Sequence, residues 1–519
     1  MNGPPIYLKL PPVAGVSKVV AALTLALVAA PVTDGALRNE VDRLVVELAA
    51  ARHLPFSGPL AAHTVTREMA DRARAVAIGV GVEAGLPGTG GGGDAEARLL
   101  ERLGLVPADT DYGTLVARTY LTAVPTASYE PGNGTRLGTL SVPDFIPLPE
   151  QRIALTHQIA HAIADRRFGL RKFLKLGPQG ERGLDGDAAR ARLAVVEGDA
   201  TLSALELQDP HERFLGPREL TALATRLSGA TATAETSGWF RDLATFTHVD
   251  GWVFVAGARA RGPWRAVDEL WTDPPASTEQ VLHPEKYEAC EAPISIDPAA
   301  LPDLPGFGRP AASDVAGELM VRSWLASALP PEIAARAAAG WGGDRAGIYT
   351  AQPGASSDAG ASSDTGASPD AGVASDAGVA SERPLAWLTV WDDDGEADDF
   401  ARAARQVLAA QTHVEPVSTD PLPPPANQRK KSSPHTAPLA PPVLEGRTLF
   451  ATPHGLYALE RRGDAVALLF AAPASSAPAL DQMLDGWQRR PSVNRRAANR
   501  PRRAAQPGCP RRDRAAGRG

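Results

Sequence analysis

A glycine recurs at every sixth position from Gly354 to Gly378, and this repeat limits what the 519-residue chain can fold into. The units read GASSDA, GASSDT, GASPDA and GVASDA, so they hold no large apolar side chain. Burial of such side chains is what offsets the entropy lost when a backbone becomes ordered. We therefore predict that residues 351–384 form a disordered insertion and that the folded parts lie on either side of it.

The composition of the chain indicates at least two folded units and excludes several classes of protein. Hydrophobic residues make up 44% of the sequence, which is enough for sizeable cores. No apolar run reaches the roughly 18 to 20 residues that a membrane-spanning helix needs, so we expect no transmembrane anchor. The net charge of -7 disfavours a specific nucleic-acid partner. The composition leaves the oligomeric state open.

The two ends of the chain differ in composition from the rest of the sequence. A short apolar run from Val19 to Val32 follows two lysines and is typical of a secretory signal, so we predict that residues 1–36 direct export to the periplasm or the medium. A buried N-terminal helix in a cytoplasmic protein is the alternative. The arginine-rich residues 488–519 lack periodicity, which indicates a disordered tail. An electrostatic arm for nucleic acid or an anionic surface is the alternative there.

Between these ends we expect a core over residues 37–350 and a C-terminal α/β segment over residues 385–487. The second of these contains a proline-rich insertion over residues 414–444, which we expect to be unfolded. Apolar spacing and turn residues predict four local structures. These are an amphipathic helix from Leu37, a strand, turn and strand around Pro131 to Gly134, a strand and helix on either side of Asp392 to Asp394, and two strands that form a hairpin around Arg461 to Asp464.

His157 and His161 lie four residues apart in a helical segment, and this spacing places both imidazoles on one face. Such a pair can bind one zinc ion, with a third ligand and a water completing a tetrahedral site. The chain has only two cysteines, so a metal site here has to use histidine and carboxylate ligands. Two structural histidines are the alternative interpretation.

A second helical segment, DGDAARARLAVVEGDATLSALEL, offers further site residues. Glu197 is a candidate for the third ligand, because a carboxylate from a neighbouring helix commonly accompanies a histidine pair. Gly198 would permit a close approach between backbones, although glycine costs a helix about 1 kcal/mol. Asp199 could orient a histidine by hydrogen bonding to its second ring nitrogen.

Together these segments resemble a known class of enzymes. The helix with His157 and His161 and the later VVEGDAT are similar to the gluzincin zinc metallopeptidases, and more narrowly to a bacterial group that reads roughly HELTHALQDQHF followed by EGDA. The resemblance implies an α+β fold with a zincin-like core, in which an antiparallel sheet precedes two active-site helices. It also implies that His157, His161 and Glu197 bind Zn²⁺. The group has a glutamate as general base at the position of Gln158.

Gln158 changes the chemistry that the resemblance implies. An uncharged amide cannot accept the proton of a zinc-bound water, and loss of a general base typically lowers a rate by roughly 10² to 10⁴. We therefore expect a zinc-metallopeptidase-like protein that is catalytically impaired, with a peptide or protein as its substrate or ligand. A non-catalytic binding or structural protein on the same fold is the alternative.

His283 is a further candidate, because it lies in a turn-like segment from which it could stabilise an oxyanion, with Tyr287 as a second candidate. Capping of a helix or hydrogen bonding to a buried carbonyl is the alternative for His283.

Overall fold

The computed structural model describes residues 31–70, 93–107, 127–132, 137–176, 183–208, 238–351, 383–418 and 446–488. Four parts of the chain lie outside the described residues, so our expectations about them stay predictions: the residues before 31, the repeat, most of the proline-rich insertion and the arginine-rich tail. The described part combines helices with two sheets, which confirms the α+β class. Among its helices, none combines the length and the apolar character needed to cross a bilayer.

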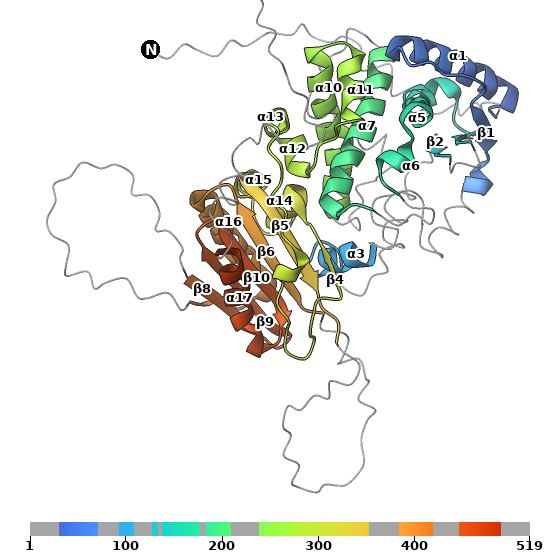
Figure 1. Cartoon of the computed structure of the whole chain (residues 1–519). Coiled ribbons are helices and arrows are strands. Elements are labelled where there is room, and N and C mark those ends of the chain that lie inside the picture. Colours follow the sequence, from blue (N-terminus) through green and yellow to red (C-terminus); the bar gives the residue numbers. More distant parts are fainter. Residues whose placement is uncertain are drawn as a thin grey trace, which may run out of the picture.

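The N-terminal half is a layer of helices beside a small sheet (Figure 1). Helix α1 (Asp34–Arg52) begins after Thr33, whose side chain accepts a hydrogen bond from the Ala36 amide and so caps the helix. Its apolar stripe is buried as the spacing predicts. The helix begins at Asp34, so the folded part starts before the predicted boundary at residue 36.

The small sheet has the strand order β1-β3-β2. Strands β2 (Ser128–Glu130) and β3 (Thr139–Pro143) pair antiparallel, which confirms the two predicted strands, while residues 133–136 between them lie outside the described part of the chain. Strand β1 (Ala61–Val65) pairs with β3 in parallel, so this small sheet holds one parallel pair beside the antiparallel pair that was expected. A long connection that includes α3 (Gly93–Arg102) separates β1 from β3, and parallel pairing requires a connection of that kind.

Helices α5 and α7 form the centre of the helical layer. Around them lie shorter helices, of which η3 is a π-helix that joins α9 to α10 without a break. The bounds of these elements are α5 (Leu148–Phe168), α6 (Leu170–Phe173), α7 (Gly186–Gln208), α9 (Gly238–Thr245), η3 (Phe246–Asp250), α10 (Gly251–Arg261), α11 (Trp264–Leu270), α12 (Thr278–Leu282) and α13 (Pro284–Glu288).

The C-terminal half is a seven-stranded antiparallel sheet with the order β4-β5-β6-β10-β9-β8-β7. Every residue of the central strands β6 and β10 is buried, because helices cover both faces of the sheet. Its elements are β4 (Ala312–Asp314), α14 (Gly317–Ala326), α15 (Pro331–Ala338), β5 (Trp341–Ile348), β6 (Leu385–Trp391), α16 (Asp394–Thr412), β7 (Val417–Ser418), β8 (Gly446–Thr452), β9 (Gly455–Arg462), β10 (Ala465–Ala472) and α17 (Pro478–Gln488), with short 3-10 turns η4 (Pro298–Ala300) and η7 (Ala474–Ser476).

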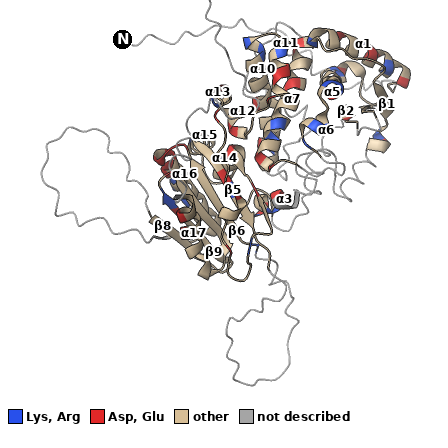
Figure 2. Ribbon diagram, viewed as in Figure 1, with Lys and Arg blue, Asp and Glu red and all other residues tan. Residues whose placement is uncertain are grey.

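Alternation along β6 divides its side chains between two hydrophobic cores. Trp387 and Trp391 belong to the core under α14 and α16, whereas Leu388 and Val390 belong to the core under α17. The acidic turn before α16 is a helix N-terminus, in which Asp393 accepts hydrogen bonds from two backbone amides. The strands of the large sheet are mostly uncharged, while acidic and basic side chains are spread over the helices (Figure 2).

The large sheet differs from the sequence predictions in two respects. The predicted hairpin around Arg461 to Asp464 is formed by β9 and β10, but β8 precedes them, so the segment holds three strands where two were expected. The repeat lies between two neighbouring strands, because Ile348 of β5 and Leu385 of β6 pair directly. The predicted division between residues 350 and 385 therefore runs through one sheet.

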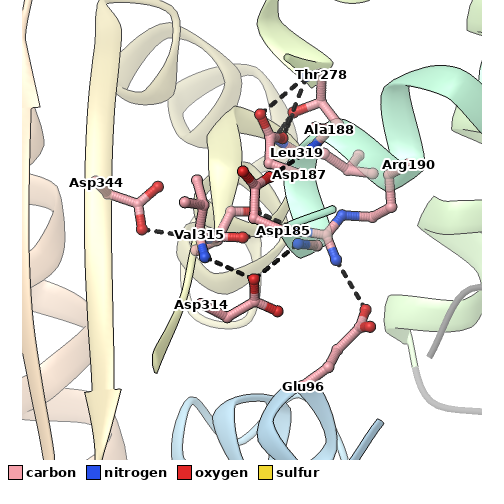
Figure 3. A network of polar contacts seen from close by, with 12 residues as sticks. Glu96, Asp185, Asp187, Ala188, Arg190, Thr278, Asp314, Val315, Leu319 and Asp344 are labelled. Carbon is pink, nitrogen blue, oxygen red and sulfur yellow. Dashed lines mark hydrogen bonds and ion pairs between the residues drawn. The ribbon is translucent and has the colours of Figure 1, made fainter. Parts of the chain in front are cut away.

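A buried polar network joins the helical layer to the sheet (Figure 3). Asp187, near the start of α7, accepts hydrogen bonds from the backbone amide and hydroxyl of Thr278, the first residue of α12. Arg190 forms a buried ion pair with Glu96 of α3 at 2.8 Å. Asp344 of β5 accepts hydrogen bonds from the amides at the start of α14. Arg190 also donates a hydrogen bond to the carbonyl oxygen of Ala316, and Asp314 of β4 accepts one from the Gly186 amide, so buried hydrogen bonds join the two halves in addition to apolar contacts.

Candidate metal centre

Helix α5 places His157 and His161 on one face, as their spacing predicts. Their Nε2 atoms lie 3.0 Å apart, and their rings meet edge to face with centroids separated by 4.6 Å. Both histidines are buried. The opposite face of α5 presents apolar side chains to α1 and the small sheet, so the helix is enclosed on two sides.

Helix α7 packs against α5 and brings Glu197 to the histidine pair. One carboxylate oxygen, Oε2, lies 3.1 Å from His157 Nε2 and 3.3 Å from His161 Nε2. The three side chains that the sequence indicated as ligands are therefore side by side.

A third histidine, His248, completes the cluster and was not predicted. Its Nε2 lies 3.2 Å from the same Oε2 of Glu197. His248 is the middle residue of the π-helix η3, which packs against α7. A π-turn is wider than an α-turn and often occurs at functional sites. The spacing of apolar residues in a sequence does not predict where such a turn forms. Since His248 also stands far from the other ligands in the chain, spacing rules could not find it.

The surroundings of His248 fix which of its ring nitrogens carries a proton. Nδ1 lies 3.2 Å from the carbonyl of Ala244 and 2.9 Å from the hydroxyl of Thr247, whose own proton is donated to the carbonyl of Leu243. Both neighbours of Nδ1 therefore act as acceptors, and Nδ1 acts as the donor. In the neutral imidazole this leaves a lone pair on Nε2 directed at Glu197, which is the arrangement of a metal-binding histidine.

Burial and neighbouring groups shift the pKa values of two residues in the cluster. Burial, with the charge of His161 as the next cause, lowers the pKa of His157 to about 4, so that its imidazole is neutral near pH 7. Burial alone would raise the pKa of Glu197, but His161 and His248 outweigh burial and hold this pKa well below its usual value. The Nδ1 atom of His157 is buried and has no hydrogen-bond partner among the described residues.

These donor atoms form a group that could hold a metal ion. His157, Glu197 and His248 offer atoms that lie within 4.8 Å of one another, whereas His161 contacts His157 and Glu197 but does not belong to this group of three. Donors about 2.0–2.1 Å from a tetrahedral zinc ion lie about 3.3–3.4 Å from one another, which is close to the separations in this cluster.

Gln158 follows the first histidine but binds outside the cluster. Its side-chain oxygen accepts a hydrogen bond of 2.8 Å from the backbone amide of Tyr129 in β2, the strand at the edge of the small sheet. The Tyr129 hydroxyl donates a further hydrogen bond to Asp165 near the end of α5. Gln158 thus helps to attach this edge strand to α5.

Asp199 also makes its contacts away from the histidines. One of its oxygens binds the guanidinium of Arg52 in a buried ion pair, and the other accepts a hydrogen bond of 2.9 Å from Trp271 Nε1. Both carboxylate oxygens are engaged in this way, so Asp199 secures α1 and α11 to α7. The geometry does not bring it to a histidine, and the expected orienting role does not follow from these contacts.

His283 lies at the junction of α12 and α13, where its Nε2 is 2.9 Å from Glu318 of α14. Tyr287 donates a hydrogen bond to the backbone oxygen of Asp273. The contacts of these two residues tie α12 and α13 to their neighbours. The structure brings neither residue to the cluster of His157, His161, His248 and Glu197, so an oxyanion role beside this metal centre has no geometric support.

Fold and cluster together define an α+β protein with a group of histidines and a glutamate that could hold a metal ion. Residues 306–423 match a family described as a domain of unknown function, DUF8575. This match takes in β4 to β7 and leaves out α5, α7 and η3, so it bears on the large sheet and not on the cluster. No curated protein and no solved structure matches the chain.

Proposed function

We propose that the chain is a zinc-metallopeptidase-like protein that keeps a metal centre and is catalytically impaired. The observation that carries this proposal is the convergence of His157, His161 and His248 on one oxygen of Glu197. Without a shared cation or proton, lone pairs on these atoms would repel one another at such separations.

Zinc is the ion that best suits these ligands. Imidazole nitrogens favour zinc, copper, iron and nickel over magnesium and calcium, which prefer oxygen ligands. Zinc in proteins is commonly tetrahedral and accepts histidine together with one carboxylate. The separations of 3.1–3.3 Å between Glu197 Oε2 and the three histidine nitrogens, and of 3.0 Å between His157 and His161, are near the edge length of such a tetrahedron.

The impairment follows from Gln158. Bound zinc supplies Lewis-acid chemistry, which polarises a carbonyl and lowers the pKa of a bound water. A base must still take up the proton, and the Gln158 amide has no such capacity. Its oxygen is moreover occupied by the amide of Tyr129. A non-catalytic binding protein on the same fold is the second candidate, and the same substitution favours it.

The resemblance to gluzincins supports two further parts of the proposal. The ligand is a peptide or a protein segment, and the protein acts outside the cytoplasm, in the periplasm or the medium. The apolar run from Val19 to Val32 supports the second part.

The test is the metal content of the purified full-length chain, measured by mass spectrometry. We expect about one zinc per chain in the wild type and none in a His157→Ala, His161→Ala double variant. The matched control is His454→Ala, which removes an exposed histidine from the turn between β8 and β9. Equal metal content in the double variant and the control would refute the centre, and metal-dependent peptide hydrolysis by the wild type would refute the impairment.

A further inference from the structure

We propose that a cavity lined by α9, η3 and α14 binds a small zwitterion of the α-amino acid class, with its ammonium group at Asp250 and its carboxylate at Arg322. The lining of this cavity includes none of the four residues of the histidine and glutamate cluster. The proposal therefore goes beyond the proposed function and does not require that the cluster bind a metal.

The cavity has the size and the walls of a small-molecule site. Its volume is about 390 Å³, which lies within the range of sites that enclose small organic ligands. Leu105, which follows α3, and Leu319 and Ala326 of α14 form apolar parts of its lining. Apolar walls with a few charged or polar groups among them are typical of such sites, because the polar groups fix the orientation of the ligand.

Asp250, the last residue of η3, is a carboxylate in this cavity that lacks a direct partner. It is partly buried, and its side chain forms no hydrogen bond and no ion pair within the described part of the chain. Asp242 differs in this respect, because it accepts a hydrogen bond of 2.9 Å from the Ser323 hydroxyl. Withdrawing a carboxylate from water without a partner costs free energy, and a cationic group bound beside Asp250 would offset that cost.

Arg322 of α14 supplies the opposite charge to the same cavity. Its guanidinium likewise forms no hydrogen bond and no ion pair with another described residue. A guanidinium binds a carboxylate through two parallel hydrogen bonds and is well suited to hold one that enters the cavity. The charge of Arg322 acts on Asp250, yet the two side chains make no direct contact. Space is therefore left for a molecule between them.

The class of the ligand follows from this pair of charges. A simple cation would leave Arg322 without a partner, and a simple anion would leave Asp250 without one. A zwitterion satisfies both groups at once. An α-amino acid carries its ammonium and carboxylate groups on one carbon atom, so its side chain is free to lie against the apolar part of the lining.

The experiment is isothermal titration calorimetry on the full-length wild type with three probes of similar shape. L-Leucine carries both charges, isoamylamine lacks the carboxylate and isocaproate lacks the ammonium group. We expect saturable binding of L-leucine with a Kd below about 10 mM. We expect each of the other two probes to bind at least about tenfold more weakly, because each leaves one charge of the protein unpaired.

Variants locate the binding in the cavity. Asp250→Asn and Arg322→Gln remove one charge each with little change of shape, and we expect both to weaken L-leucine binding by about tenfold or more. The matched controls are Asp399→Asn and Arg265→Gln, which alter side chains that are 56% and 85% exposed on α16 and α11. Both controls should bind L-leucine like the wild type.

Three results would overturn the proposal. They are no saturable binding of L-leucine up to about 10 mM, equally tight binding of isoamylamine or isocaproate, and L-leucine binding that Asp250→Asn and Arg322→Gln leave unchanged. Each titration is repeated after treatment with a chelator, because a metal ion at the cluster could itself bind an amino acid. Binding that disappears with the metal would also overturn the proposal. The wild-type titrations decide the question if a variant fails to fold.

Discussion

Gly198 of α7 and Gly251 of α10 lie against each other's helix with no room for a side chain. A Cβ atom at Gly198 would be 2.3 Å from the carbonyl oxygen of Gly251, and one at Gly251 would be 2.3 Å from the carbonyl oxygen of Ala194. The two helices therefore touch backbone to backbone. Glu197 precedes the first glycine directly and His248 lies three residues before the second, so this contact constrains the separation of two candidate metal ligands.

Substitution of Gly198 by alanine should weaken metal binding. The added Cβ has to push α7 away from α10, and both sides of the contact are backbone, which cannot rotate aside as a side chain would. We expect the free energy of unfolding to fall by about 1–3 kcal/mol and the affinity for zinc to fall with it.

Gly257→Ala is the matched control, because a Cβ there meets only the end of the Arg261 side chain at 3.7 Å. It should be neutral or stabilising by up to about 1 kcal/mol. Calorimetry and a zinc-competition assay measure both effects, and equal behaviour of the two variants would contradict the role of the contact.

Gln158→Glu should not by itself create a peptidase. The new carboxylate has the chemistry of a base, but it can accept the hydrogen bond that the Tyr129 amide now donates to Gln158, and this contact lies outside the cluster. We therefore expect no zinc-dependent cleavage of a peptide library by this variant. Cleavage by Gln158→Glu would show that a base at this position reaches a metal-bound water.

Asp199→Asn should lower stability and leave the metal in place. Breaking a buried ion pair by removing one partner typically costs about 3–5 kcal/mol, and Asp199 is the buried partner of Arg52. Its carboxylate contacts no histidine in the described structure. Denaturant unfolding should show the loss, and zinc per folded chain should be unchanged. Metal loss at unchanged stability would instead support the orienting role that the sequence suggested.

Asp187 should make the protein less stable as the pH rises. Burial raises the pKa of Asp187 to about 8, above its unfolded value of 3.8, so the folded state binds the proton more tightly. The stabilisation is complete below about pH 4 and is lost as the pH rises through about 8. We expect a loss on the order of a few kcal/mol between pH 5 and 8 in the wild type, and a flatter profile in Asp187→Asn.

The exposed Asp399→Asn is the control for this profile and should follow the wild type. Parallel profiles for the wild type and Asp187→Asn would show that this carboxyl is ionised in the folded protein.

The sequence predicted the site residues that can be recognised from their spacing within a helix. His157 and His161 share a face because four residues are about one helical turn, and Glu197 could be chosen because it lies in a second helix with a glycine beside it. His248 could not be chosen in this way, since its position depends on one π-turn and on the contact at Gly251. The same limit applies to β1, whose parallel pairing with β3 is decided by a distant part of the chain.

Elements with strong alternation were predicted well and their boundaries less well. The hairpin of β9 and β10 was predicted from the alternation of apolar and polar residues and from the turn between the strands. The turn before Gly455, which separates β8 from β9, was missed because the apolar alternation continues from β8 towards β9. The contacts of Asp199 with Arg52 and Trp271 join three helices, and no spacing rule relates such residues.

The direct pairing of Ile348 with Leu385 makes this point of the sheet a natural place to engineer an insertion. Because the chain leaves β5 and enters β6 at adjacent positions, the two strand ends would accept a passenger domain whose own termini lie close together. The entropic cost of a longer connection grows slowly, at roughly 0.6 kcal/mol for each doubling of its length. A fluorescent or affinity domain placed there would leave unchanged the strand register and the helices that carry the candidate metal centre.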